Sequence, residues 1–73
     1  MDESFVLTVG DRDYECEFQR WGYSYRISVG IDDSTVWFEP DEERNFRAIS
    51  MDGKMVDGKL LADIALKLEE AFR

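Results

Sequence analysis

The sequence lacks histidine entirely and contains only one cysteine and one proline in 73 residues. Without histidine, its serines and its cysteine have no usual general base, and no nucleophilic catalytic pair is recognisable. The single cysteine, Cys16, excludes an intrachain disulfide and a zinc site built from several cysteines and histidines. Because Cys16 falls in an alternating apolar stretch, we expect it to be a small core residue. The sequence therefore predicts no enzyme, no cofactor and no catalytic or metal centre, and a fold stabilised by apolar packing.

Basic residues are also scarce, with 9 Lys and Arg against 17 Asp and Glu and a formal net charge of -8. Such a surface repels phosphate backbones and anionic lipids, so nucleic acid and membranes are not expected partners. No apolar run approaches the ~20 residues of a membrane-spanning helix, and residues 1–4 lack the features of a signal peptide. We expect a cytoplasmic protein whose acidity serves solubility or attracts a basic protein partner.

The stretch 56–72 has the three- and four-residue spacing of an amphipathic helix. Asp57 is placed to cap its first turn, and Leu66 projects from its otherwise polar side. One helix does not bury its own apolar stripe, so the preceding chain must supply a surface for it to cover. The stripe consists of Leu60, Leu61, Ile64, Ala65, Leu68, Ala71 and Phe72.

Before this helix, apolar and polar residues alternate in short runs separated by Gly, Asp and Pro, which is typical of antiparallel strands. We predict one small α+β domain over residues 1–73, an antiparallel five-stranded meander sheet with the C-terminal helix packed on one face. The alternative is a four-stranded sheet in which the first or last run forms a loose edge. The expected strands cover residues 5–9, 14–18, 24–31, 34–39 and 44–50.

The alternation also predicts the strand register. Val9 should face Tyr14 across the first turn, and Glu17, Arg26 and Glu39 should form a row on the side that the helix leaves bare. The inward set of the sheet is Phe5, Leu7, Tyr14, Phe18, Tyr25, Ile27, Val36, Phe38, Phe46 and the small Ala48, which would let the helix approach closely.

The bare face of the sheet is the first candidate site. Trp37 should lie directly across from Arg47, whose guanidinium can stack on the indole, and Trp, Ile and Arg are typical of protein interfaces. In the alternative interpretation, Trp37 simply shields the sheet backbone with Arg47 lying over it. The candidate interaction residues are Trp37, Arg47, Ile49 and Arg26 on this face, with Trp21 and Tyr23 in a turn.

An acidic loop, Glu39, Asp41, Glu42 and Glu43, is the second candidate. It can bind a basic site on another protein or collect a divalent cation, because hard cations take several oxygen ligands. The loop lacks the alternating Asp/Asn spacing and the closing glutamate of a calcium-binding loop. A solvated turn is the simplest interpretation.

The segment Phe38-Glu39-Pro40-Asp41-Glu42-Glu43, followed by Phe46-Arg47-Ala48 and the terminal helix, resembles short uncharacterised bacterial proteins with an F-E-P-D-E-E segment. The resemblance covers about the second half of the chain and implies no known activity, substrate or site residue.

Three functional hypotheses follow. The first is a non-enzymatic protein-interaction domain that holds a partner, or a second copy of itself, through the bare sheet face or a free edge. The second is an acidic inhibitor or mimic that occupies a basic site on another protein. The third is a weak divalent-cation-binding module.

Overall fold

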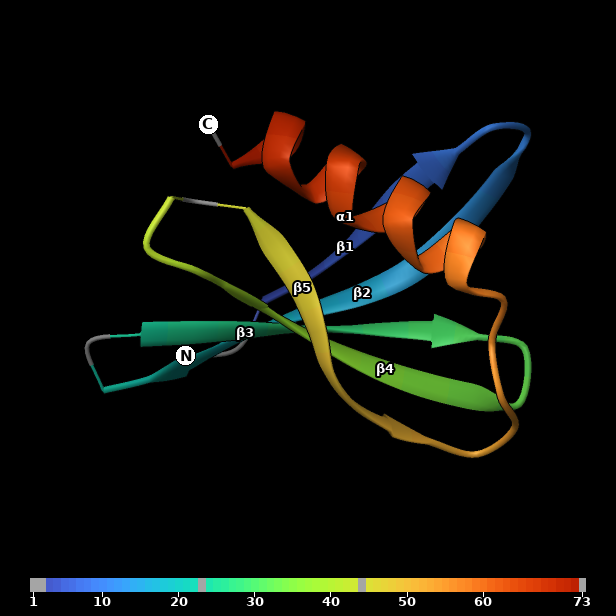
Figure 1. The fold of residues 1–73 in the computed structure, drawn as a ribbon, viewed down its shortest axis with the longest axis horizontal. Helices are drawn as coiled ribbons and strands as arrows, with labels where there is room; N and C mark the ends of the chain where they lie inside the picture. Colours follow the sequence, from blue (N-terminus) through green and yellow to red (C-terminus); the bar gives the residue numbers. More distant parts are fainter. Residues whose placement is uncertain (1–2, 23, 44, 73) are drawn as a thin grey trace.

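The computed structural model describes residues 3–22, 24–43 and 45–72, with only the backbone of Trp21. Within these residues the chain forms an antiparallel five-stranded sheet in the order β1-β2-β3-β4-β5, followed by one helix (Figure 1). The predicted α+β meander with a C-terminal helix is therefore confirmed, and the four-stranded alternative is wrong. The elements are β1 (Glu3–Val9), β2 (Arg12–Trp21), β3 (Ser24–Ile31), β4 (Ser34–Pro40), β5 (Phe46–Asp52) and α1 (Gly58–Ala71).

The helix lies over one side of the twisted sheet and contacts the two edge strands, β1 and β5 (Figure 1). The core forms between α1 and the central strands, where Ile27, Val29, Val36 and Phe38 are fully buried. Ile64 and Leu68, one turn apart on the helix, supply the buried apolar stripe. Alternation along the strands thus separates a side covered by α1 from an outer face, which here means the side of the sheet opposite α1.

The helix begins where the sequence predicts. The carboxylate of Asp57 accepts a hydrogen bond from the Lys59 backbone N–H at 3.2 Å, and its carbonyl accepts one from Leu61 at 3.1 Å. Asp57 is therefore an N-cap that satisfies a backbone donor left free by the first helical turn. Among the residues described, no helix is both long and apolar enough to cross a bilayer.

The predicted register of the first two hairpins is wrong by two residues. Val9 pairs with Arg12, not Tyr14, so the first connection is the two-residue turn Gly10–Asp11. Gly10 has a φ of 66°, the positive value that a tight two-residue hairpin turn needs at this position. A shift of two residues keeps every side chain on its predicted face, and for that reason the apolar pattern alone did not exclude it.

The same two-residue shift between β2 and β3 changes the predicted row of charges on the outer face. Glu17 pairs with Ser28, and Arg26 pairs with Gln19, so the expected Glu17–Arg26 pair is wrong. The register between β3 and β4 is as predicted, and it places Arg26 beside Glu39, with Nε and Oε2 3.9 Å apart.

Strand β5 departs furthest from expectation. Its pairing with β4 shifts between Trp37 and Phe38, which leaves Ile49 as an extra, bulged residue between the partners Ala48 and Ser50. Ala48 lies opposite Phe38 but is exposed, so its expected role beneath the helix is wrong. Phe46 is the buried residue of this strand, because β5 is an edge strand that bends away from the core beyond it.

Candidate functional site

Among the side chains that the structure describes, the large aromatic one on the outer face is Trp37, on β4. It is partly buried, and its lateral neighbours in the sheet are the small residues Ser28 and Ser50. Because both neighbours are short, no large side chain from an adjacent strand stands beside the indole in its own row. Trp37 therefore presents apolar surface on the side of the sheet that α1 does not cover.

The predicted pair of Trp37 and Arg47 is wrong. Arg47 pairs instead with Glu39, because the register of β4 with β5 also differs from the predicted one by two residues, and the bulge then places Ser50 instead of Ile49 across from Trp37. The sequence contains no signal for the bulge, since Ile49 fits the alternation of a regular strand. The shift still keeps Arg47 one row from the indole, at a diagonal position.

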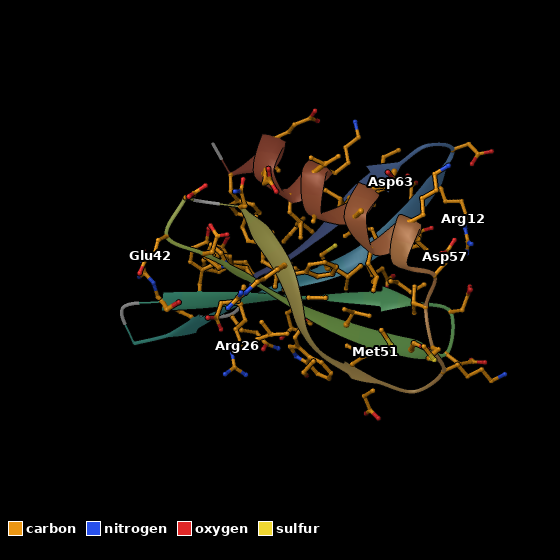
Figure 2. All side chains as sticks on the ribbon, viewed as in Figure 1. Arg12, Arg26, Glu42, Met51, Asp57 and Asp63 are labelled. Carbon is orange, nitrogen blue, oxygen red and sulfur yellow. The ribbon has the colours of Figure 1, made fainter. Side chains whose placement is uncertain are left out.

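The structure nevertheless brings the four predicted outer-face residues into one patch, here called the outer patch: Trp37, Ile49, Arg26 and Arg47. Arg26 and Arg47 flank Glu39 on neighbouring strands, in the row next to Trp37. Figure 2 shows Arg26 pointing away from α1. Ile49 is 38% exposed at the bulge beside the partner of Trp37. The patch combines an indole, an exposed aliphatic side chain and two arginines on the strands that flank Glu39, of which Arg26 reaches the Glu39 carboxylate.

A shallow hollow of about 540 Å³ adjoins the outer patch. Gly30 lies in it, and Ser28, Thr35, Val6 and Glu15 are among the residues around it. The hollow exists because Gly30 carries no side chain and Ser28 and Thr35 beside it are small, while Val6 is 60% exposed at its border. Sequence reasoning missed this depression, although a glycine inside a strand is a known signal of close approach by another group.

The acidic loop between β4 and β5 is organised by one of its own carboxylates. Oδ1 of Asp41 accepts hydrogen bonds from the backbone N–H groups of Glu43 at 2.8 Å and Asn45 at 2.9 Å. The N–H of Asp41 in turn donates to the Asn45 carbonyl at 2.8 Å. Figure 2 shows Glu42 projecting from this loop at one end of the molecule. Asp41 thus shapes the turn, while Glu42 and Glu43 are exposed.

Metal binding would need several ligands converging on one point. Within the described part of the chain, no group of three or more Asp, Glu, Cys or His side chains is close enough to hold an ion. Asp41 directs one carboxylate oxygen to two amides of its own loop, which leaves less of that group for a cation.

The second predicted aromatic pair, Trp21 and Tyr23, belongs to the end of β2 and the connection that follows it. Trp21 ends β2, where its backbone pairs with Ser24. The side chain of Trp21 and the whole of Tyr23 lie outside the described residues.

Cys16 is buried in the core at 3% exposure, and its Sγ lies 3.6 Å from the Tyr14 carbonyl oxygen. Burial raises the pKa of the Cys16 thiol to about 11, because an anionic thiolate would lose its hydration there. At neutral pH the group is a protonated, inaccessible thiol, so it is not a nucleophile.

Sequence reasoning also missed an aromatic cleft at the end of the molecule where α1 stops. We use this name for the hollow of about 620 Å³ lined by Phe5, Phe18, Tyr25, Phe72, Glu3 and Arg20. The rings of Phe18 and Tyr25 stack with centroids 4.8 Å apart. Phe72 lies among them, 5.7 Å from Phe5 and 5.9 Å from Phe18.

These aromatic residues were expected in the core, and their grouping on the helix side follows from the alternation. The alternation does not predict that these aromatic side chains are exposed, because their exposure depends on the length of the helix. The 14 residues of α1 span about 21 Å, whereas the 10 residues of β2 span nearly 30 Å. The helix therefore ends before it covers this end of the sheet, and Phe72 remains 38% exposed.

Comparison of the chain with protein-family models, with curated proteins and with solved structures found no match.

Proposed function

We propose that this chain is a small, non-enzymatic, cytoplasmic protein-interaction domain that binds a partner protein through its outer patch. The observation that carries the proposal is the partly buried indole of Trp37 on a sheet face that α1 does not cover, with exposed Ile49 on the adjoining edge strand. Trp and Arg are the side chains that most often dominate binding energy at protein interfaces. An adjoining hollow about the size of a few side chains gives the partner a place to insert.

The edge of β5 supports the same assignment. At the first residue of β5, the N–H of Phe46 donates a hydrogen bond to Oε2 of Glu69 on α1 at 3.2 Å. The helix therefore already satisfies the backbone donor at this end of the edge strand. Further along, Ile49 and Met51 are exposed, at 38% and 39%. Residues 48–51 carry no charge, and edge strands without charges are the ones that readily pair with another chain. A partner that adds an extended segment here would also reach the outer patch.

The test is the paired replacement Trp37→Ser with Ile49→Ser. A photo-cross-linking group at residue 50 identifies the partner in the native host, and the purified pair then gives an affinity for each variant. We expect the double variant to bind at least about ten-fold more weakly, because the loss of a central Trp removes a large share of interface energy. Its circular dichroism should keep the helix signal.

The matched control is Leu66→Ser, which removes a 59% exposed apolar side chain from α1 on another side of the molecule. It should leave affinity unchanged. If the partner is a second copy, the same comparison is made on hydrodynamic mass. An affinity and a mass that are equal in wild type and double variant would refute the proposal.

The ordered acidic loop favours a second function, an acidic inhibitor or mimic for a basic protein site. Its backbone is held by the two hydrogen bonds to Asp41, so Glu42 and Glu43 are presented without a large ordering cost on binding. In this case Glu42→Gln with Glu43→Gln, and not the outer-patch variant, should abolish binding. Binding should also weaken steeply with salt, because exposed charges are screened.

A further inference from the structure

The aromatic cleft takes no part in the proposed interaction through the outer patch. It opens on the helix side of the sheet, at the end where the β2–β3 connection and the C-terminal end of α1 both lie (Figure 1). Phe5, Phe18 and Tyr25 are only partly buried, although each faces the side of the sheet that α1 covers elsewhere. An open, ring-lined hollow of this size lies within the range of small-molecule sites.

The aromatic rings of the cleft pack on one another in both stacked and edge-to-face arrangements. Phe72 is stacked on Phe18 at an interplanar angle of 22°, while it meets Phe5 edge-on at 69°. Tyr25 also contacts Phe72, with centroids 6.1 Å apart. Offset-stacked and edge-to-face pairs are the arrangements that aromatic rings prefer. An additional planar ring on the open side of the cleft would therefore pack against aromatic side chains that line it.

The rim of the cleft carries one charge of each sign. Glu3 on β1 pairs with Phe18 on β2, and Arg20 follows Phe18 by two residues on the same face. Glu3 and Arg20 are therefore diagonal neighbours, with Cα atoms about 7–8 Å apart. Both side chains line the hollow. This spacing leaves room for a small group between the two charges, with its apolar part directed at the rings.

We propose that the aromatic cleft binds a free aromatic α-amino acid. Its ring packs against the open side of the cluster of Phe5, Phe18 and Phe72, the guanidinium of Arg20 binds its carboxylate, and the carboxylate of Glu3 binds its ammonium group. An aromatic acid without an ammonium group would face Glu3 unpaired, and an aromatic amine would leave Arg20 unpaired. The zwitterion is the simplest ligand that complements both charges and the rings together.

The experiment is an amide NMR titration of the whole chain with L-phenylalanine as the probe. We expect shifts at Glu3, Arg20, Ser24 and Phe72, and none with L-alanine, which lacks the ring. Phenylacetate, phenethylamine and N-acetyl-phenylalanine amide, which lack the ammonium group, the carboxylate and both charges respectively, should all bind more weakly than L-phenylalanine.

Two charge-removing variants test the assigned roles. Arg20→Gln should weaken the binding of L-phenylalanine about three- to five-fold, as expected for an exposed ion pair, and should leave the binding of phenethylamine unaffected. Glu3→Gln should weaken the binding of L-phenylalanine by a similar factor. It should not weaken the binding of phenylacetate, which has no ammonium group to pair with Glu3. Arg47→Gln removes the same charge from the outer face and should change nothing in the cleft.

Three results would overturn the proposal. The first is the lack of any shift in the cleft up to the solubility limit of L-phenylalanine. The second is equal binding of the uncharged N-acetyl-phenylalanine amide, which would make the cleft a site for a side chain of another protein. The third is unchanged L-phenylalanine affinity in both charge variants, which would remove the zwitterion-specific contacts.

Discussion

Among the glycines, Gly53 in the connection between β5 and α1 is the one at which an added Cβ would clash with backbone atoms. Its φ is 105°, and a Cβ there would lie 2.6 Å from the Asp33 carbonyl oxygen and 2.9 Å from Cα of Ser34. Next to it, Oγ of Ser34 donates a hydrogen bond to the Lys54 carbonyl at 2.6 Å. The close approach of these two segments therefore requires a residue without a side chain.

We expect Gly53→Ala to lower the free energy of unfolding by more than about 1 kcal/mol. Backbone strain at a positive φ costs about 1–3 kcal/mol, and the clash adds to it. The matched control is Gly58→Ala at the start of α1, where a Cβ meets no atom within 4 Å. That change should be neutral or stabilising by up to about 1 kcal/mol. Denaturant unfolding of both variants checks the difference, and equal effects would contradict it.

Cys16 makes the folding stability of the chain depend on pH in the alkaline range. The pKa of its thiol is raised by burial from 9.0 to about 11 in the folded state. Below pH 9 the thiol is protonated in both states, so its contribution to stability is fully present. Between pH 9 and 11 only the unfolded state releases the proton, and stability falls as pH rises. Unfolding of wild type and Cys16→Ala over this range should show the steeper fall in wild type, and equal slopes would contradict the burial argument.

At the scale of elements, α1 and the sheet depend on each other through a narrow stripe. Leu68 is fully buried against the sheet, whereas Leu66, two residues earlier, is 59% exposed. The same substitution at the two positions therefore separates packing from helix propensity.

We expect Leu68→Ala to cost about 2–5 kcal/mol of unfolding free energy, through lost transfer energy and a cavity. Leu66→Ala should change it by less than about 0.5 kcal/mol, as for other exposed positions. For a chain of this size the former change is a large share of total stability. Thermal unfolding followed by circular dichroism measures both, and similar losses would mean that α1 packs on a different face.

For the whole molecule, the dominant electrostatic feature is the excess of 17 acidic over 9 basic residues. The ion pairs joining described residues lie at the surface, as Arg12–Asp32 at 3.0 Å does, and each contributes little. Self-repulsion of the net charge therefore outweighs these local pairs at low ionic strength.

We expect the midpoint of thermal unfolding to rise when NaCl is increased to ~0.5 M, because screening weakens the repulsion. The paired change Glu42→Gln with Glu43→Gln should raise the midpoint at low salt and reduce its dependence on NaCl. A midpoint that falls with added salt would show that the surface ion pairs, not the net charge, dominate.

Much of this architecture was predictable because local rules act on it directly. Alternation separates the two faces of the sheet, the three- and four-residue spacing predicts α1, and Asp57 begins the helix as expected. The register of the first two hairpins was not predictable, since a two-residue slip keeps each side chain on its face. The apolar alternation also does not predict the bulge at Ile49, and therefore does not predict which residue lies across from Trp37.

The sequence by itself determined which side chains are apolar, how they alternate, and hence that an antiparallel sheet and one helix must share a core; the structure decided for five strands over four. The tertiary structure alone decided how far that core is covered. A helix of about 21 Å lies over longer strands, so aromatic residues that the pattern assigns to the interior line an open cleft. Local periodicity specifies the direction of a side chain, but exposure depends on what the rest of the chain can reach.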